Sequence, residues 1–205
     1  MTLEGDLIKI LKEWIAVVGV DIKVFRLTHP QRGMFKYCYY PDFRALMIFR
    51  ASQLCYQWRI TKPLAYFLTI LNDLITGVWI GPRVVIGPGL SLGHPRGLVV
   101  NPDTRIGCYC SILQRVTIGG PNVEIGDYVS INAGAAIISN VRGRGRLTIG
   151  NYVIIGAGAV VVHDVPDCSV VVGVPGRVIK NINPEENWFT FTLRYLAKQN
   201  KEKKR

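Results

Sequence analysis

The stretch IGPRVVIGPGLSLG at residues 80–93 sets the pattern that decides the fold. An aliphatic residue stands at every sixth position of this stretch, and a glycine follows each one. The same unit returns as IGNYVIIGAGAVV at residues 149–161, and the spacing between the two stretches slips only near Leu98 and near Pro121. The aliphatic ladder comprises Ile80, Ile86, Leu92, Leu98, Val100, Ile106, Ile112, Ile118, Ile125, Ile131, Ile137, Ile149, Ile155 and Val161.

A repeat of six residues is long enough for one short strand and one turn. The aliphatic residue of each unit points inward, and the small residue beside it permits a tight corner. Three units then complete one triangular coil, so that residues 80–172 form about five coils stacked into a parallel β-helix. The sequence therefore predicts a mainly β fold whose core is one continuous aliphatic column.

The N-terminal third of the chain has a different periodicity, with apolar residues at helical spacing. Residues 43–58 and 64–75 repeat apolar positions at i, i+3 and i+4, and Pro41 and Asp42 form a start signal for the first of them. A further helix is predicted around residues 7–18. The predicted organisation is an α-helical N-terminal region at residues 1–76, a β-helix domain at residues 77–180, and a short C-terminal helix with a basic tail at residues 181–205.

Composition and charge narrow the classes of function. The formal net charge of +11 favours anionic partners, but the arginine-rich loop at residues 142–146 has no aromatic residues within it, which argues against nucleic acid. Five cysteines at irregular spacing indicate neither a metal site nor a disulfide framework. We expect no bound metal and a cytoplasmic protein. A γ-type carbonic anhydrase would need several histidines per site, and the chain has only three.

Five segments resemble one protein family more closely than the repeat alone requires. They are residues 43–50, 92–100, 111–120, 155–161 and 171–178. They resemble the hexapeptide-repeat acyltransferases, in particular the serine acetyltransferase branch. The resemblance implies a left-handed parallel β-helix, acetyl-CoA as co-substrate, and a homotrimer in which CoA runs along the groove between two β-helices.

The resemblance also implies a site. His94, in the segment that carries the catalytic histidine of the family, is predicted to be the general base, because a neutral imidazole can accept the proton of an attacking hydroxyl. His163 is interpreted as structural, and His29 lies outside the repeat. By the resemblance, small residues line the pantetheine arm and basic residues meet the phosphates of CoA. This cofactor set is Thr117, Gly119, Gly120, Ala133, Ala157, Arg177 and Lys180.

Three departures from the family pattern bear on the acceptor. Trp79 stands where serine acetyltransferases carry the carboxylate that orients the histidine, and Gly93 replaces the acid directly before it. The loop that contacts the amino-acid substrate is shortened to residues 121–122. Asp73 and Asp103 are weak candidates to orient His94 instead.

These departures make the pattern closest to the capsule and exopolysaccharide (colanic-acid-type) O-acetyltransferases. We therefore expect acetyl transfer to a sugar hydroxyl of a saccharide or lipid-linked saccharide. Serine O-acetylation is the alternative within catalysis, and a non-catalytic trimeric β-helix scaffold is the alternative of another class. The apolar N-terminal helices and the many basic residues suggest peripheral docking on an anionic membrane surface, with plain core packing an equal alternative.

Overall fold

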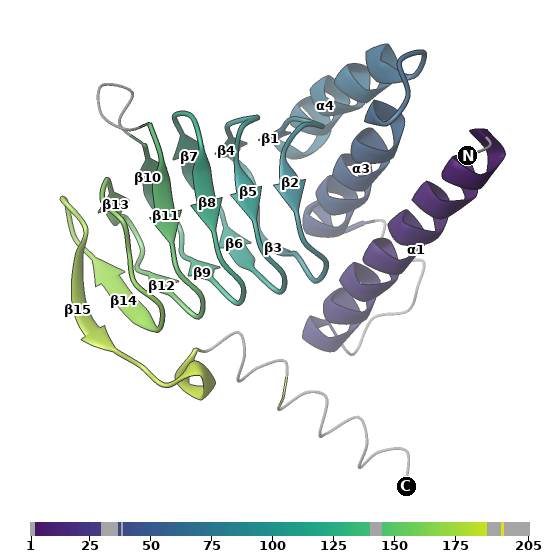
Figure 1. Cartoon of the computed structure of the whole chain (residues 1–205). Coiled ribbons are helices and arrows are strands. Elements are labelled where there is room, and N and C mark those ends of the chain that lie inside the picture. Colours follow the sequence, from purple (N-terminus) through teal and green to yellow (C-terminus); the bar gives the residue numbers. More distant parts are fainter. Residues whose placement is uncertain (1–2, 30–36, 38, 140–144, 188–193, 195–205) are drawn as a thin grey trace, which may run out of the picture.

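The computed structural model describes residues 3–29, 37, 39–139, 145–187 and 194 of the chain. Three helices lead into a triangular prism of short strands, and one strand folds back over the far end of the prism (Figure 1). No helix within these ranges has the length and apolarity needed to cross a bilayer.

The strands form three sheets, one on each side of the prism. Sheet A contains β1 (Val78–Ile80), β4 (Leu98–Val100), β7 (Thr117–Gly119), β10 (Ala136–Ile138) and β13 (Val160–Val161). Sheet B contains β2 (Val85–Ile86), β5 (Arg105–Ile106), β8 (Val123–Ile125) and β11 (Leu147–Ile149). Sheet C contains β3 (Ser91–Gly93), β6 (Ser111–Leu113), β9 (Ser130–Ile131), β12 (Ile154–Ile155), β14 (Ser169–Val172) and β15 (Arg177–Asn181).

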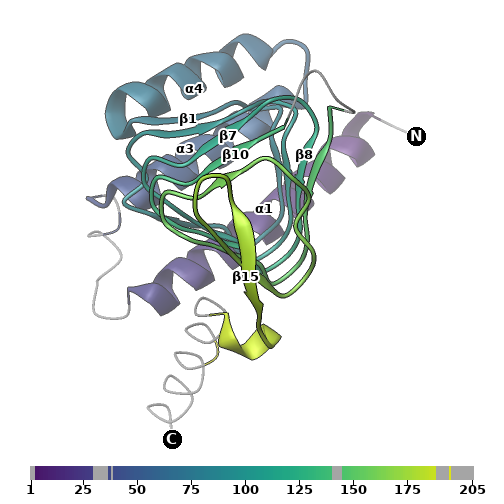
Figure 2. The same ribbon diagram turned by 90° about the vertical axis from the view of Figure 1, so that its left-hand side faces the viewer.

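Successive coils pair in parallel, with Val78 opposite Leu98 and Ile86 opposite Ile106. Figure 2 views the prism from its C-terminal end. The chain passes clockwise from sheet A to sheet B to sheet C while it advances toward the viewer, so the β-helix is left-handed, as expected. Four coils are complete, and in the fifth the side on sheet B shrinks to a single bridge between Ile149 and Val165.

The aliphatic ladder forms the core. Every residue of the predicted ladder is at most 5% exposed. Both slips in the repeat fall at corners: the first lies between β3 and β4, and the second between β7 and β8, where Asn122 has a φ of 54°. The extra residues are therefore absorbed where the chain turns, and the inward register of the strands is kept.

Two parts of the sequence prediction fall largely outside the described residues. Of the arginine-rich loop, residues 142–144 lie outside, and Arg146 donates to Glu124 at 2.6 Å. At the start of the segment predicted as a C-terminal helix and basic tail, residues 181–205, the structure has the end of β15 at Asn181 and a 3₁₀ turn, η1, at Pro184–Glu186. Residues 188–193 and 195–205 are not described.

The helices are α1 (Leu3–Thr28), α3 (Pro41–Tyr56) and α4 (Lys62–Thr76). The predicted helix at residues 7–18 was too short, because α1 continues for ten more residues at its C-terminal end. The apolar periodicity is broken at Asp21, whose side chain is fully buried. Because this buried position carries a charged residue, the spacing of apolar residues does not reveal the second half of the helix.

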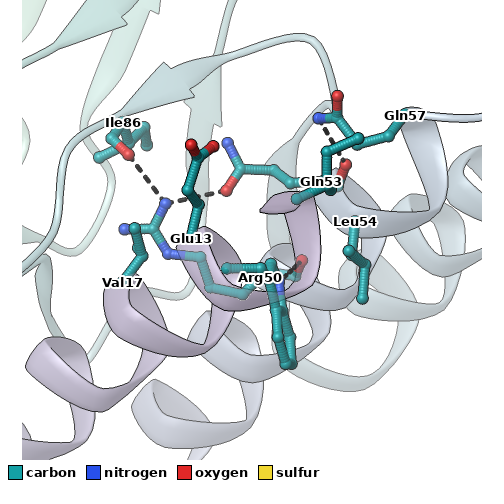
Figure 3. A pocket seen from close by; sticks show the side chains of 9 residues that line it. Glu13, Val17, Arg50, Gln53, Leu54, Gln57 and Ile86 are labelled. Atoms are coloured by element: carbon teal, nitrogen blue, oxygen red, sulfur yellow. Dashed lines mark hydrogen bonds between the residues drawn. The ribbon is translucent and has the colours of Figure 1, made fainter. Parts of the chain in front are cut away.

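Asp21 is tied to Arg50 of α3, and this pair fixes the helices to the first coil. Arg50 Nε donates to Asp21 Oδ2 at 2.7 Å, and its two other nitrogens donate to the carbonyls of Ile86 and Gly87. Figure 3 shows the bond from Arg50 to Ile86. Asp21 Oδ1 accepts from the backbone N–H groups of Gly89 and Leu90. Burial raises the pKa of Asp21, while Arg50 and these N–H groups oppose the rise.

Gly77 joins α4 to the β-helix. It has a φ of 72°, and its N–H donates to the carbonyl of Asp73 at 2.8 Å, which closes the helix. A Cβ at this position would lie 3.0 Å from Cγ of Arg96. The junction therefore requires glycine, and it lies directly beneath the corner that carries the predicted catalytic histidine.

Candidate functional site

His94 lies on the corner between β3 and β4, where sheet C passes to sheet A. Its φ is 48°, and Arg115, one coil further on, has a φ of 57°. This left-handed conformation is uncommon for residues other than glycine, and here it follows from the tight corner. The side chain of His94 is exposed, as a base that must reach a substrate requires.

Two clefts meet at His94. The outer groove, of about 450 Å³, is lined by His94, Arg96, Gln114, Arg115, Ala133 and Gly134. The inner cleft, of about 330 Å³, lies between the first two coils and the helical region. Its walls come from residues 28–29 at the C-terminal end of α1, residues 40–42 at the start of α3, and strands β3 and β6. His94 thus stands between a groove along the β-helix and a pocket beneath the helices.

Backbone hydrogen bonds connect the equivalent corner positions of successive coils. Gly134 N–H donates to Gln114 O at 2.9 Å, and Gly158 N–H donates to Ala133 O at 2.9 Å. At the end of the column, Gly176 N–H donates to Val160 O at 2.7 Å. Coils are spaced by about 4.8 Å, so the corner at Ala157 lies roughly 14 Å from that at His94. The predicted residues Ala133, Ala157 and Arg177 follow this line.

The other predicted cofactor residues lie outside this row of stacked corner positions. Thr117 begins β7 immediately after the corner, with its side chain on the outer face of sheet A. Gly119 and Gly120 lie at the far end of that strand, toward sheet B. Lys180 pairs with Val170 on β15, away from the corner. His94, Ala133 and Ala157 therefore lie in a row along the corner with Arg177 near its last coil, whereas Gly119, Gly120 and Lys180 lie away from it.

The groove has the shape that a pantetheine arm needs. Side chains built at Gly134 or Gly158 would enter open space, since a Cβ at Gly158 meets nothing within 4 Å and one at Gly134 meets only a backbone nitrogen at 4.0 Å. The missing side chains leave backbone accessible along the corner. Arg96 and Arg115 line the same groove, and guanidinium groups suit phosphate recognition. The residues present therefore fit CoA.

Within the described residues, the imidazole of His94 makes no hydrogen bond or ion pair with another side chain. Of the two proposed orienting carboxylates, Asp103 is paired with Arg83 at 2.6 Å on a different corner. Asp73 is an exposed residue of α4 that the inner cleft and the outer groove do not include. Trp79 projects from the outer face of β1 and is 43% exposed.

Sequence reasoning missed two residues of the inner cleft. Asp42, in the first turn of α3, is 8% exposed, and its Oδ2 lies 3.6 Å from Nε2 of His29. Both residues line the cleft that His94 also lines. Asp42 was read only as a helix start signal and His29 only as a residue outside the repeat. The spacing of the repeat carries no information about which helical residues reach the first coil.

No group of three or more His, Cys, Asp or Glu side chains in the described part of the chain is arranged to hold a metal ion. A further cavity, of about 220 Å³, lies between α1 and α3 and is lined by Glu13, Gln53 and Gln57 among others (Figure 3). Neither His94 nor Asp42 lines this cavity.

A left-handed β-helix of six-residue units with a histidine on its corner groove defines a class, the hexapeptide-repeat acyltransferases. No family model matches the chain. The serine acetyltransferase of Bacillus pumilus is 35% identical over 153 residues, which cover 72% of this chain and 70% of that protein. The chain therefore belongs to the serine acetyltransferase family.

Solved structures of serine acetyltransferases also match the chain. Serine acetyltransferase from Brucella abortus in complex with coenzyme A matches with a TM-score of 0.75 and 30% identity, covering 87% of this chain and 72% of that one. The enzyme of Neisseria gonorrhoeae in complex with serine matches with a TM-score of 0.73 and 33% identity, covering 82% and 70%. The chain spans 54–61% of the length of the serine acetyltransferases of Synechococcus elongatus, Synechocystis and Bacillus subtilis.

These relatives contradict the predicted sugar acceptor. Serine acetyltransferases match at 35–39% identity, and no support emerges for the resemblance to capsule or exopolysaccharide enzymes. The prediction was wrong because it took the departures at positions 79 and 93 and in the loop at residues 121–122 as evidence against serine. A comparison of positions along the chain cannot detect that the fold brings another carboxylate, Asp42, to the cleft beside His94.

Proposed function

We propose that the chain is an acetyl-CoA-dependent serine O-acetyltransferase with His94 as its general base. The observation that carries the proposal is the position of His94 between two clefts. The outer groove suits CoA, and the inner cleft suits a small acceptor. Family membership supports the same donor and acceptor, because related enzymes have been solved with coenzyme A and with serine.

The reaction needs one proton acceptor at the meeting point of the clefts. His94 takes the proton of the serine hydroxyl as its oxygen forms a bond to the thioester carbonyl carbon. The carbon–sulfur bond then breaks, and the protonated His94 returns the proton to the departing thiolate. General-base assistance of this kind contributes about 10²–10⁴ in rate.

The cofactor roles follow from position along the corner. Ala133 and Ala157 would contact the pantetheine arm, with Thr117 beside them on sheet A, and Arg177 would meet a phosphate at the end of the column. Gly119, Gly120 and Lys180 remain predicted cofactor residues, although they lie further from the corner.

Release of CoA from acetyl-CoA with L-serine tests the proposal. Wild type should release CoA in a serine-dependent way, and His94→Ala should lower kcat by about 10²–10⁴. His163→Ala is the matched control, because this exposed histidine lies beyond β13 at the far end of the prism. Equal rates in wild type and His94→Ala, or no serine-dependent release at all, would refute the proposal and favour a scaffold.

We further infer a homotrimer. α4 buries small and polar residues, Ala65, Thr69, Asn72 and Thr76, against the rest of the chain. Its large apolar side chains are exposed, with Phe67 at 57% and Leu74 at 78%, and Trp79 of β1 adds to this surface. A contiguous apolar surface of this kind marks an interface. Light scattering should give three times the mass of the chain.

The peripheral membrane association predicted from the same helices stays a prediction. Co-sedimentation with anionic liposomes at low ionic strength, lost at high salt, is its test. A stable trimer with no binding at low salt would leave the apolar face of α4 to the contacts between subunits.

A further inference from the structure

One residue interrupts a column of glycines on the corner that carries His94. The strand registers place five residues above one another there, and each has a φ in the left-handed region. They are Gly77 at 72°, Gly97 at 79°, Arg115 at 57°, Gly134 at 71° and Gly158 at 68°. Glycine adopts this conformation without steric cost, whereas the Cβ of arginine is crowded in it.

The strained backbone of Arg115 has no compensating contact of its side chain. Tyr109 and Tyr128 have similar φ values on another corner, but their rings stack with centroids 5.2 Å apart. Arg115 is exposed, and its guanidinium makes no hydrogen bond, ion pair or ring contact with the residues that the structure describes. Strained positions of this kind cluster at active sites, so the arginine at this position indicates a function.

Arg115 lies close to His94, at the reactive end of the outer groove. The residue before His94 pairs with Leu113 on the next coil, so Arg115 is one coil and one residue further on. Adjacent coils are about 4.8 Å apart, and both side chains line the groove. In the direction proposed for CoA, the phosphates lie toward Arg177 near the last coil. The guanidinium of Arg115 is therefore placed for the thioester and not for the phosphates.

We propose that Arg115 donates a hydrogen bond to the thioester carbonyl oxygen of acetyl-CoA and stabilises the negative charge that this oxygen gains. The assignment rests on the proposed function, because it concerns the same acetyl transfer. As the hydroxyl oxygen bonds to the carbonyl carbon, one electron pair of the C=O bond moves onto the carbonyl oxygen. That pair returns when the carbon–sulfur bond breaks, and His94 carries the proton from the hydroxyl to the sulfur.

The charge of Arg115 acts mainly on the barrier of the reaction. A hydrogen bond from a charged donor strengthens as its acceptor becomes negative. The contact is therefore stronger in the transition state than in the bound substrate, which raises kcat more than it lowers KM.

The kinetic test uses Arg115→Gly, which introduces the residue that the rest of the column has. Its Tm should be equal to or higher than that of wild type, because the strain is relieved. We expect kcat to fall by about 10²–10³, the usual cost of removing one oxyanion donor, with the KM for acetyl-CoA within about threefold of wild type. Arg105→Ala is the control, since it removes an exposed charge from sheet B outside both clefts and should match wild type in kcat.

Two other kinetic results would overturn the proposal. A raised KM for acetyl-CoA with an unchanged kcat in Arg115→Gly would show that Arg115 binds a phosphate. Unchanged values of both constants would show that it is only a solvated charge. Arg115→Lys keeps a positive charge at the position, so it should retain more activity than Arg115→Gly.

Infrared difference spectroscopy provides a measurement that needs no acceptor. Acetyl-CoA isotope-labelled at the thioester carbonyl carbon is bound to wild type, Arg115→Gly and Arg105→Ala. In wild type the carbonyl stretch should lie at lower frequency than in free acetyl-CoA, because a donated hydrogen bond weakens the C=O bond. The shift should persist in Arg105→Ala and disappear in Arg115→Gly. A stretch that does not move on binding to wild type, or that moves equally in Arg115→Gly, would overturn the assignment.

The outcomes separate the role of Arg115 from the proposed function. Serine-dependent CoA release with an unchanged kcat in Arg115→Gly would overturn the role and leave the function standing. A carbonyl shift that depends on Arg115, without serine-dependent CoA release, would support the role and refute the function. Wild type that neither binds acetyl-CoA nor releases CoA would overturn both.

Discussion

Replacement of Asp21 by asparagine should destabilise the protein strongly, because it breaks a buried ion pair. The side chains of Arg50 and Asp21 are 2% and 0% exposed. Removal of one member of such a pair costs about 3–5 kcal/mol, since the remaining charge stays buried without its partner. For a chain of this size, roughly 2–4 °C of Tm correspond to each kcal/mol. We therefore expect Tm to fall by about 6–20 °C.

A double-mutant cycle isolates the pair. Tm and urea unfolding are measured for wild type, Asp21→Asn, Arg50→Met and the double variant at one protein concentration, because oligomerisation makes Tm depend on concentration. The double variant should be more stable than the sum of the single effects predicts, by about 0.5–3 kcal/mol. Single effects below about 1 kcal/mol that add without coupling would refute the idea that this pair holds α1 and α3 to the first coil.

Three further predictions concern the β-helix. Ile118→Ala, in the fully buried ladder, should cost about 2–5 kcal/mol in urea unfolding, whereas Val85→Ala, 48% exposed on sheet B, should change stability by less than about 1 kcal/mol. Gly107→Ala should be more destabilising than Gly158→Ala in thermal melts, because a Cβ at 107 would lie 2.7 Å from the backbone of the next coil while one at 158 meets only the strain of a φ of 68°. Burial raises the pKa of Cys110 to about 12, so its thiol stays protonated at pH 8. Mass spectrometry should find Cys110 unmodified by iodoacetamide in the folded protein and alkylated in urea, and rapid labelling of the folded protein would contradict this.

The β-helix could be predicted from the sequence because its energetics are local and periodic. Each six-residue unit buries its own aliphatic residue against identical neighbours, so one pattern fixes the core, the register and the corners together. The position of His94 on a corner could be predicted for a related reason, since it lies inside the repeat, where sequence spacing translates directly into position. Its role as the general base stays a prediction.

The helical region could not be predicted to the same depth. Asp21 interrupts the apolar pattern of α1. Its partner, Arg50, is 29 residues away, so no local sequence pattern predicts that ion pair. Asp42 is equally hidden, because its place beside His94 depends on how α3 packs against β3. The sugar acceptor was predicted wrongly because departures at single positions along the chain were given more weight than the overall resemblance to serine acetyltransferases.

The most direct test of the central claim is the identity of the product. Acetyl-CoA labelled in its acetyl group is incubated with L-serine and either wild type or His94→Ala, and the products are separated and identified by mass spectrometry at slightly acidic pH, where the ester is preserved. The account predicts labelled O-acetylserine with wild type and at least about 100-fold less with His94→Ala. Labelled acetate without the ester, or equal amounts of O-acetylserine from both proteins, would contradict it.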